Sequence, residues 1–340
     1  MTAYAALDVS MEKTAICVID ADGRILLETV TTTDAGAIAS RLAPYLAEFE
    51  RVGFEAGPLS EWLFRGLRDQ GIDAVLMETR QVRAALSAMV AKTDRNDARG
   101  MAQLLRSGWF RPVHVKTVPA REQRTLLAAR STLMRRQKDI ENSMRGLLKG
   151  FGMRLGRLLR ARWDDAVRDV VSGNPMLAMI MEPLLVVRRT LREQLAILEK
   201  KVRDIARDDA VCRRLMTAPG VGAVVALTFR AAVDQPGRFR SSKSVGPCFG
   251  LTPRKYQSGE IDRTGAISRA GDPAVRLALF EAAHVLLTRV AKWSTVKAWA
   301  VNVAKRRGAK RAKVALARKL GIILHRMWVD ESDFQFGKPA

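Results

Sequence analysis

Two aspartates three residues apart, Asp94 and Asp97, form the pair whose type and spacing most clearly indicate chemistry. Positions i and i+3 are neighbours on one face of a helix, and the apolar residues that follow predict an amphipathic helix ending near Gly108. A carboxylate pair alone is common on solvated helix faces. Its meaning therefore depends on which other acids can reach it.

Two further acids stand at the ends of predicted strands. Asp8 follows the apolar stretch 4–7, and Glu55 follows a short apolar run beginning at Val52. If these strands lie side by side, four carboxylates gather at one edge of a sheet. Like charges that close cannot all stay ionised without cations, so we expect Mg²⁺ or Mn²⁺. Two such ions about 4 Å apart can hold the attacking and leaving oxygens of a phosphodiester.

The elements around these acids predict an α/β domain over residues 1–115. Three strands within residues 4–31 form antiparallel hairpins, and strands at 52–55 and 74–76 then alternate with helices at 34–49 and 60–70. The Asp94/Asp97 helix closes the unit. This order predicts a mixed sheet.

Charge separates this domain from the rest of the chain. Residues 1–115 hold 13 Lys and Arg against 15 Asp and Glu, whereas residues 116–340 hold 45 against 20, a net charge of +25. Such a basic remainder is typical of a nucleic-acid binder. No apolar run predicts a membrane span, no signal peptide is apparent, and three isolated cysteines indicate a reduced, cytosolic protein.

Residues 116–208 predict a helical linker. Two long helices, at 121–149 and 176–207, flank a glycine-interrupted region. The apolar spacing suits a helical hairpin or coiled coil without a clean heptad register, so an intramolecular hairpin and a dimer seam are both open.

Residues 209–330 predict a mainly α-helical basic domain, followed by a tail at 331–340. The stretch around Gly220 and Gly222 predicts a helix-hairpin-helix-like turn whose backbone approaches a phosphate. A dense basic run further on predicts contacts with backbone phosphates, made by Lys305, Arg306, Arg307, Lys310 and Arg311. His114, His284 and His325 are scattered and favour ordinary packing or surface roles.

The four acids in their local sequences, Leu-Asp8-Val-Ser, Phe-Glu55-Ala-Gly and Lys-Thr-Asp94-Arg-Asn-Asp97-Ala, resemble the D-E-D-D tetrad of a RuvC-like ribonuclease H fold. These local sequences are similar to those of DEDD insertion-sequence transposases related to the Piv DNA invertase, many of which are bridge-RNA-guided serine recombinases. The sequence from Gly250 to Asp272 resembles the C-terminal transposase domain of the same family.

The resemblance implies that Ser258 is a nucleophile, because it occupies the Ser-Gly step of the family motif. Family members often show Ser-Ser-Gly, and Gln257 takes the first position here; Ser241 and Ser242 are the alternatives. A serine hydroxyl is a poor nucleophile until it is deprotonated or its target is polarised. Basic neighbours would neutralise the phosphate or bind nucleic acid: Arg254, Lys255, Arg263 and Arg269.

The resemblance further implies a recombinase in the bacterial cytoplasm, at the nucleoid, acting on donor and target double-stranded DNA. It implies a covalent phosphoserine intermediate, a non-coding bridge RNA as guide, and a homo-oligomer, either dimer or tetramer. Two other functions stay open. One is a RuvC-like Holliday-junction nuclease that uses water as its nucleophile, and the other is a nucleic-acid-binding scaffold with an inactive nuclease fold.

Overall fold

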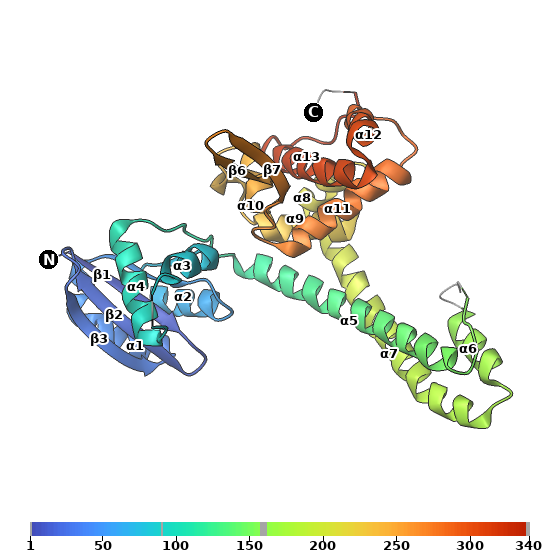
Figure 1. Cartoon of the computed structure of the whole chain (residues 1–340), viewed down its shortest axis with the longest axis horizontal. Coiled ribbons are helices and arrows are strands. Elements are labelled where there is room, and N and C mark those ends of the chain that lie inside the picture. The colour runs from blue at the N-terminus through green and yellow to red at the C-terminus, as the bar shows by residue number, and fades with distance from the viewer. Residues whose placement is uncertain (1, 90, 157–161, 338–340) are drawn as a thin grey trace. The chain divides into compact units, whose positions relative to one another are not determined.

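A five-stranded mixed sheet forms the centre of the amino-terminal part of the chain (Figure 1). Its strands run in the spatial order β3-β2-β1-β4-β5, with β1, β2 and β3 antiparallel and β4 and β5 parallel to β1. Their bounds are β1 Ala3–Val9, β2 Lys13–Asp20, β3 Ile25–Thr32, β4 Phe49–Glu55 and β5 Ala74–Met77. The predicted mixed α/β sheet is confirmed, and it is consistent with a RuvC-like fold.

This computed structural model describes residues 2–89, 91–156 and 162–337. The chain divides into two compact units, residues 1–116 and residues 117–340. The long central helices fall in the second unit, together with the basic helices that follow them. Positions 338–340 of the predicted tail lie outside the described residues.

Helices cover both faces of the sheet. On one face, α1 (Ala35–Leu42) and α2 (Ser60–Asp69) pack against Leu7 and Phe54. On the other, α4 (Asp94–Ser107) packs against Ala6, with α3 (Thr79–Leu86) beside it.

Two local expectations for this unit were wrong. The helix predicted over 34–49 ends at Leu42 and continues as a 3₁₀ turn, Ala43–Glu48, because Pro44 has no N–H to extend the α-helical ladder. The chain also forms α3, which the sequence analysis did not predict. Only Val82 of this short helix is buried.

A long antiparallel pair of helices begins the second unit. α5 (Val118–Lys149) packs along α7 (Pro175–Asp208), and the glycine-interrupted stretch between them forms a further helix, α6 (Trp163–Val171). The three helices share a core that includes Met144, Trp163 and Met181. The intramolecular hairpin is thus formed within one chain.

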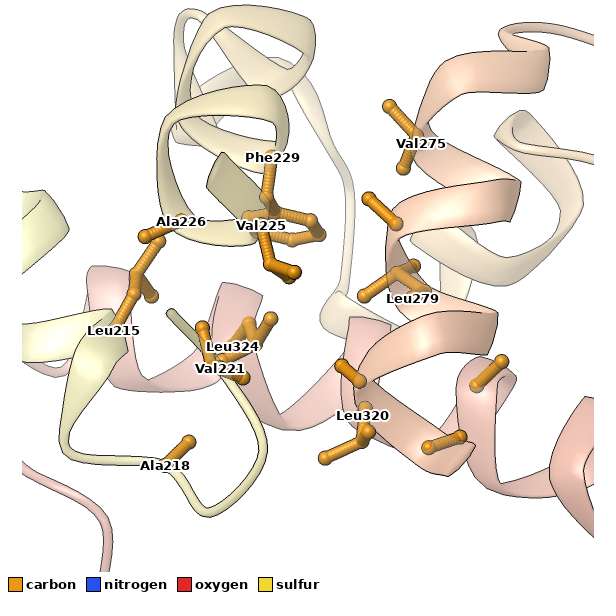
Figure 2. Packing of buried hydrophobic residues seen from close by; sticks show 14 of the residues in the cluster. Leu215, Ala218, Val221, Val225, Ala226, Phe229, Val275, Leu279, Leu320 and Leu324 are labelled. Carbon is orange, nitrogen blue, oxygen red and sulfur yellow. The ribbon is translucent and has the colours of Figure 1, made fainter. Parts of the chain in front are cut away.

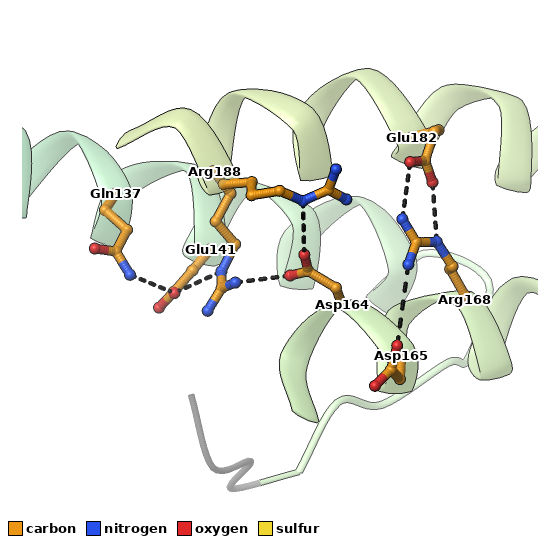
Figure 3. Close-up of polar contacts among 8 residues, drawn as sticks. Gln137, Glu141, Asp164, Asp165, Arg168, Glu182 and Arg188 are labelled. Carbon is orange, nitrogen blue, oxygen red and sulfur yellow. Dashed lines mark hydrogen bonds and ion pairs between the residues drawn. The ribbon is translucent and has the colours of Figure 1, made fainter. Parts of the chain in front are cut away.

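A buried arginine holds these three helices together (Figure 3). The side chain of Arg188 on α7 is 0% exposed and donates to Glu141 on α5 at 2.8 Å and to Asp164 on α6 at 2.7 Å. Its guanidinium also lies 5.2 Å from the centroid of the Trp163 ring. A buried charge is tolerated only when it is paired, so these contacts fix how the helices dock.

The remaining elements form a mainly helical basic region around one apolar core (Figure 2). Leu215, Phe229, Leu279 and Leu320 meet there from four helices. The elements are α8 (Ala210–Met216), α9 (Ala223–Val233), short 3₁₀ turns at Pro236–Arg238 and Ser242–Ser244, α10 (Val245–Cys248), β6 (Pro253–Ser258), β7 (Ile261–Ile267), α11 (Pro273–Thr288), α12 (Thr295–Arg307) and α13 (Ala309–Val329). In the described residues, no helix is long and apolar enough to cross a membrane.

Replacing Arg188 with Met should destabilise the second unit, because Glu141 and Asp164 then lose a shared partner in a largely buried site. We expect the free energy of unfolding to fall by about 3 kcal/mol. Chemical denaturation followed by circular dichroism measures the change.

Arg168→Met is the matched control, since Arg168 is 45% exposed and its partner Glu182 is 48% exposed. It should change stability by less than about 1 kcal/mol. Adding Glu141→Gln and Asp164→Asn to Arg188→Met should recover most of the loss. Equal stability of Arg188→Met and the wild type would contradict the role given to this ion pair.

Candidate functional site

Asp8 and Glu55 lie at the same edge of the sheet and on the same face. β1 and β4 are parallel, with Leu7 beside Phe54, so the next residue of each strand is Asp8 and Glu55. Side chains alternate along a strand, and Leu7 and Phe54 face α1 and α2. The two acids therefore face the side of the sheet that α4 covers, and both are partly buried.

The first turn of α4 brings the other two acids to this face. Thr93 caps the helix, its Oγ1 accepting a hydrogen bond from the Asn96 N–H at 3.2 Å. Asp94 and Asp97 follow directly, where the positive end of the helix dipole stabilises carboxylates. Met101 and Leu105 on the same helix are buried against the sheet and fix its position.

The carboxylates are close enough to perturb one another. Burial raises the pKa of Asp8 to about 6, and the negative charges of Asp94, Asp97 and Glu55 add to the rise, while Lys92 opposes it. Burial also raises the pKa of Glu55, a hydrogen bond from Thr79 lowers it, and the charge of Asp97 raises it further. The positive charge of Lys92, to which the sequence alone assigned no role, thus lowers the pKa of both strand acids.

This donor set suits a divalent cation chemically. Carboxylate oxygens are the ligands that Mg²⁺ and Mn²⁺ prefer, and a cation would offset both the burial of the Asp8 charge and its repulsion by the other acids, which together raise the pKa of Asp8. The side chains are nevertheless not yet gathered around one point. Among the residues that the structure describes, no group of three or more His, Cys, Asp or Glu is arranged closely enough to hold a metal ion. Binding would have to draw the carboxylates together.

Ser258 lies at the end of an exposed β-hairpin in the second unit. It is the last residue of β6, paired with Ile261 of β7, and Gly259 makes the turn with φ +53°. The region expected to be mainly α-helical therefore also contains two strands that were not predicted. The Ser258-Gly259 dipeptide, a common turn sequence, is the signal that would have indicated a hairpin here.

The hairpin groups its side chains by face. Cross-strand neighbours point the same way, so Tyr256 and Arg263, which are paired, share the face of Ser258. Lys255 lies on the opposite face and pairs with Asp262 at 3.1 Å. Arg254 is exposed and donates to the Ser268 carbonyl, and Arg269 adopts φ +55° just beyond the hairpin. Of the predicted basic residues, Arg263 is therefore the one whose strand pairing places it on the same face of the hairpin as Ser258.

Close backbone packing holds the base of this hairpin. A Cβ on Gly271, where φ is +65°, would lie 2.1 Å from the Cys248 carbonyl oxygen, and one on Gly250 would lie 2.3 Å from the Ala270 backbone. Arg276 donates to the carbonyls of Phe249, Ala270 and Gly271. The hairpin thus projects from a tightly packed base.

The alternative serine at position 242 has a different setting. Its hydroxyl lies 2.9 Å from Nδ1 of His325, which is 2% exposed, and Nε2 of His325 lies 3.1 Å from the Pro236 carbonyl oxygen. With the proton on Nε2, Nδ1 accepts from Ser242. By contrast, Ser258 Oγ has no hydrogen-bond partner among the described residues.

The two predicted phosphate-binding glycines differ in their surroundings. Gly220 has φ +86°, and a Cβ there would lie 2.5 Å from the Ala282 carbonyl oxygen, so close packing against α11 already requires glycine. Gly222 is exposed and precedes α9 without a side-chain cap. The basic run is also exposed, and it spans a helix break at Gly308 between α12 and α13: Lys305, Arg306, Arg307, Lys310 and Arg311.

Comparisons with known proteins define the class. A transposase family model of the IS110 DEDD type matches residues 5–153, and a model described as "Transposase IS116/IS110/IS902 family" matches residues 212–298. The two regions contain the acidic site and the serine hairpin. The protein is a transposase, an enzyme that recombines DNA of mobile elements.

Relatives match along most of the chain. The transposase for insertion sequence element IS1111A of Coxiella burnetii is 27% identical over 83% of this chain and 78% of its own length. A probable family 20 transposase of Pseudomonas aeruginosa is 27% identical over 84% and 86%. The transposase for insertion sequence element IS1328 of Yersinia enterocolitica is 26% identical over 68% and 71%. The two matched regions and these relatives make the chain similar to DEDD transposases of the IS110/IS116 family.

Replacing Asp8 with Asn should raise the thermal stability of the metal-free protein at pH 7.5. The pKa of Asp8 is raised in the folded state, so folding favours its protonated form, and that stabilisation is lost as pH rises from about 4 through about 6. The neutral amide removes a partly buried charge and its repulsion by the other acids. Each kcal/mol gained in the free energy of unfolding should raise the midpoint temperature by about 4 °C. Thermal unfolding in EDTA at pH 7.5 and at pH 4 measures it.

At pH 4 the difference should disappear, because Asp8 is then protonated in the wild type. Asp22→Asn is the control, since Asp22 is an exposed acid in the turn between β2 and β3. A lower midpoint for Asp8→Asn at pH 7.5 would show that its charge does not strain the fold.

Proposed function

We propose that this transposase cleaves and exchanges DNA strands through a covalent phosphoserine intermediate formed by Ser258, with Asp8, Glu55, Asp94 and Asp97 holding Mg²⁺ or Mn²⁺. One observation carries the proposal. Folding directs two strand-end acids and two helix acids to one face of the sheet, where burial raises the pKa of Asp8 and the charges of the other three acids raise it further. Carboxylates that repel one another need a counter-cation, and metal-dependent nucleases use such cations to cleave DNA.

The cation, when bound, supplies positive charge beside the phosphate and polarises its bonds. The remaining chemistry belongs to the chain. A bond forms between Ser258 Oγ and phosphorus while the bond from phosphorus to one deoxyribose oxygen breaks. The serine proton passes to a base or to water, and the leaving oxygen is protonated as a hydroxyl. Attack by a hydroxyl of another strand reverses these steps and releases Ser258.

The serine's surroundings support this role. Ser258 is exposed at the tip of a projecting hairpin and can reach a duplex without unfolding of the core. Arg263 on the same face is a bidentate donor suited to a phosphate, and Tyr256 beside it can pack on the sugar. Further basic residues, including Arg254 and Arg269, would contact flanking phosphates.

Nucleic acid is the natural partner of the second unit. Its exposed basic run at the junction of α12 and α13 places five Lys and Arg within seven residues. We propose that donor and target DNA bind there and at Gly222, through phosphates and without base readout. We also propose a non-coding bridge RNA that supplies the sequence specificity by base pairing.

A homo-oligomer, dimer or tetramer, would complete the enzyme. The helical hairpin formed by α5 and α7 leaves apolar side chains of α7 exposed, including Met176 (61%), Met179 (63%) and Ile197 (59%). Helices that expose such residues bury them against a partner helix. A second copy of the hairpin would cover them and bring two catalytic units to one recombination site.

Trapping the covalent intermediate tests the nucleophile. With Mg²⁺ and a nicked donor duplex, the wild type should give a protein–DNA adduct on denaturing gels, and Ser258→Ala should give none because it lacks the attacking oxygen. Ser242→Ala is the matched control and should retain the adduct.

The outcomes separate the alternatives. Wild-type cleavage without an adduct would favour the junction nuclease that uses water. An adduct that survives Ser258→Ala but not Ser242→Ala would move the nucleophile to the Ser242–His325 pair. No cleavage and no adduct with any cation would favour the nucleic-acid scaffold.

RNA guidance is tested by sequencing RNA that co-purifies with the full chain in 0.15 M salt. We expect one discrete RNA, encoded beside the gene, whose removal by ribonuclease lowers site-specific recombination at least about tenfold. A heterogeneous RNA population, or full site specificity after ribonuclease treatment, would contradict guidance by RNA.

A further inference from the structure

Helix α4 carries arginines as well as the two acids. Arg95 and Arg99 are four residues apart and share one side of the helix, while Asp94 and Asp97 share another. A guanidinium beside an acidic site is a competitor, because it can pair with the carboxylates in place of a cation. The position of these two arginines therefore bears on whether the acids are available.

Both arginines bind one carboxylate on the opposite side of the helix from the acids. Glu28 of β3 accepts hydrogen bonds from Arg95 and from Arg99, the Arg99 Nη2 at 2.8 Å. Glu28 is in register with Cys17, which packs under α4, and its side chain is only 10% exposed. The Arg99 hydrogen bonds lower the pKa of Glu28, and those from Arg95 add to the effect.

The arrangement segregates charge along one helix. Its cationic side is paired with Glu28 of β3, at the antiparallel edge of the sheet, and its acidic side faces β1 and β4. Among the described residues, the ion pairs of Arg95 and Arg99 are with Glu28 and none is with Asp94 or Asp97. The Lys92 charge is the cation that acts on Asp8 and Glu55.

We propose that Glu28 is a positioning residue for the metal site: it holds Arg95 and Arg99 away from Asp94 and Asp97, so that these carboxylates remain free to take a divalent cation. This inference rests on the proposed function. Without Glu28, the two long arginine side chains lose their partner while they share a helix turn with Asp94 and Asp97, and attraction draws them round the helix towards the four acids.

Direct binding measurements test the proposal. Mn²⁺ binding to the EDTA-stripped full chain is measured by calorimetry for the wild type and for Glu28→Gln, with folding checked by circular dichroism. We expect the affinity of Glu28→Gln to fall about tenfold, as for other residues that orient metal ligands indirectly. Glu12→Gln, which changes an exposed glutamate in the turn between β1 and β2, should leave it unchanged.

Removing the arginines separates charge segregation from simple packing. In the triple variant Glu28→Gln, Arg95→Gln, Arg99→Gln, no guanidinium remains to compete, so the affinity should return to within about twofold of the wild type. If Glu28 only held α4 on the sheet, the triple variant would bind as weakly as Glu28→Gln or more weakly, and the proposal would be overturned.

The double variant Arg95→Gln, Arg99→Gln keeps the test decisive if Glu28→Gln does not fold. It should bind Mn²⁺ at least as tightly as the wild type, and weaker binding would contradict the proposal. Failure of the proposed function looks different. In that case the wild type itself shows no saturable Mn²⁺ binding that Asp8→Asn removes.

Discussion

Repulsion between carboxylates at one edge of a sheet is the constraint on which the rest of this structure depends. The parallel pairing of β1 and β4 leaves no choice about Asp8 and Glu55, because the strand register that buries Leu7 and Phe54 also places the acids side by side. Helix α4 then adds Asp94 and Asp97. The apolar packing of Met101 and Leu105 has to outweigh this repulsion, and the helix dipole offsets part of it. The folded protein therefore holds these carboxylates in an unfavourable charge state, which a bound cation would relieve.

The two units differ in net charge and in where that charge is concentrated. The first is nearly neutral in net charge and concentrates negative charge at one edge, where a polyanion is repelled unless cations are present. The second carries the excess of Lys and Arg and exposes it on a hairpin and at a helix junction. In the proposed mechanism, binding of nucleic acid by the second unit and chemistry at the first are controlled by different ions. Salt weakens the former, and divalent cations promote the latter.

Sequence reasoning succeeded where local pattern and spacing carry the information. Short apolar runs predicted the mixed sheet, and the spacing of Asp94 and Asp97 with the apolar residues after them predicted the start of α4. It failed where an element buries little apolar surface and so leaves no periodic pattern, and where a contact joins residues far apart in the chain. The β6–β7 hairpin is exposed and short, α3 buries only Val82, and the break at Gly308 interrupts an otherwise helical basic run. The partners of Arg188 and Glu28 lie tens of residues away, and no periodicity identifies them.

Anomalous X-ray scattering from crystals of the full chain grown with Mn²⁺ tests the central claim most directly. The account predicts a strong manganese peak between the ends of β1 and β4 and the start of α4, with carboxylate oxygens of Asp8, Glu55, Asp94 and Asp97 drawn to within about 2.0–2.4 Å of it. Crystals grown in saturating Mn²⁺ that show no peak there, or a manganese ion bound elsewhere while the four carboxylates stay apart, would contradict it.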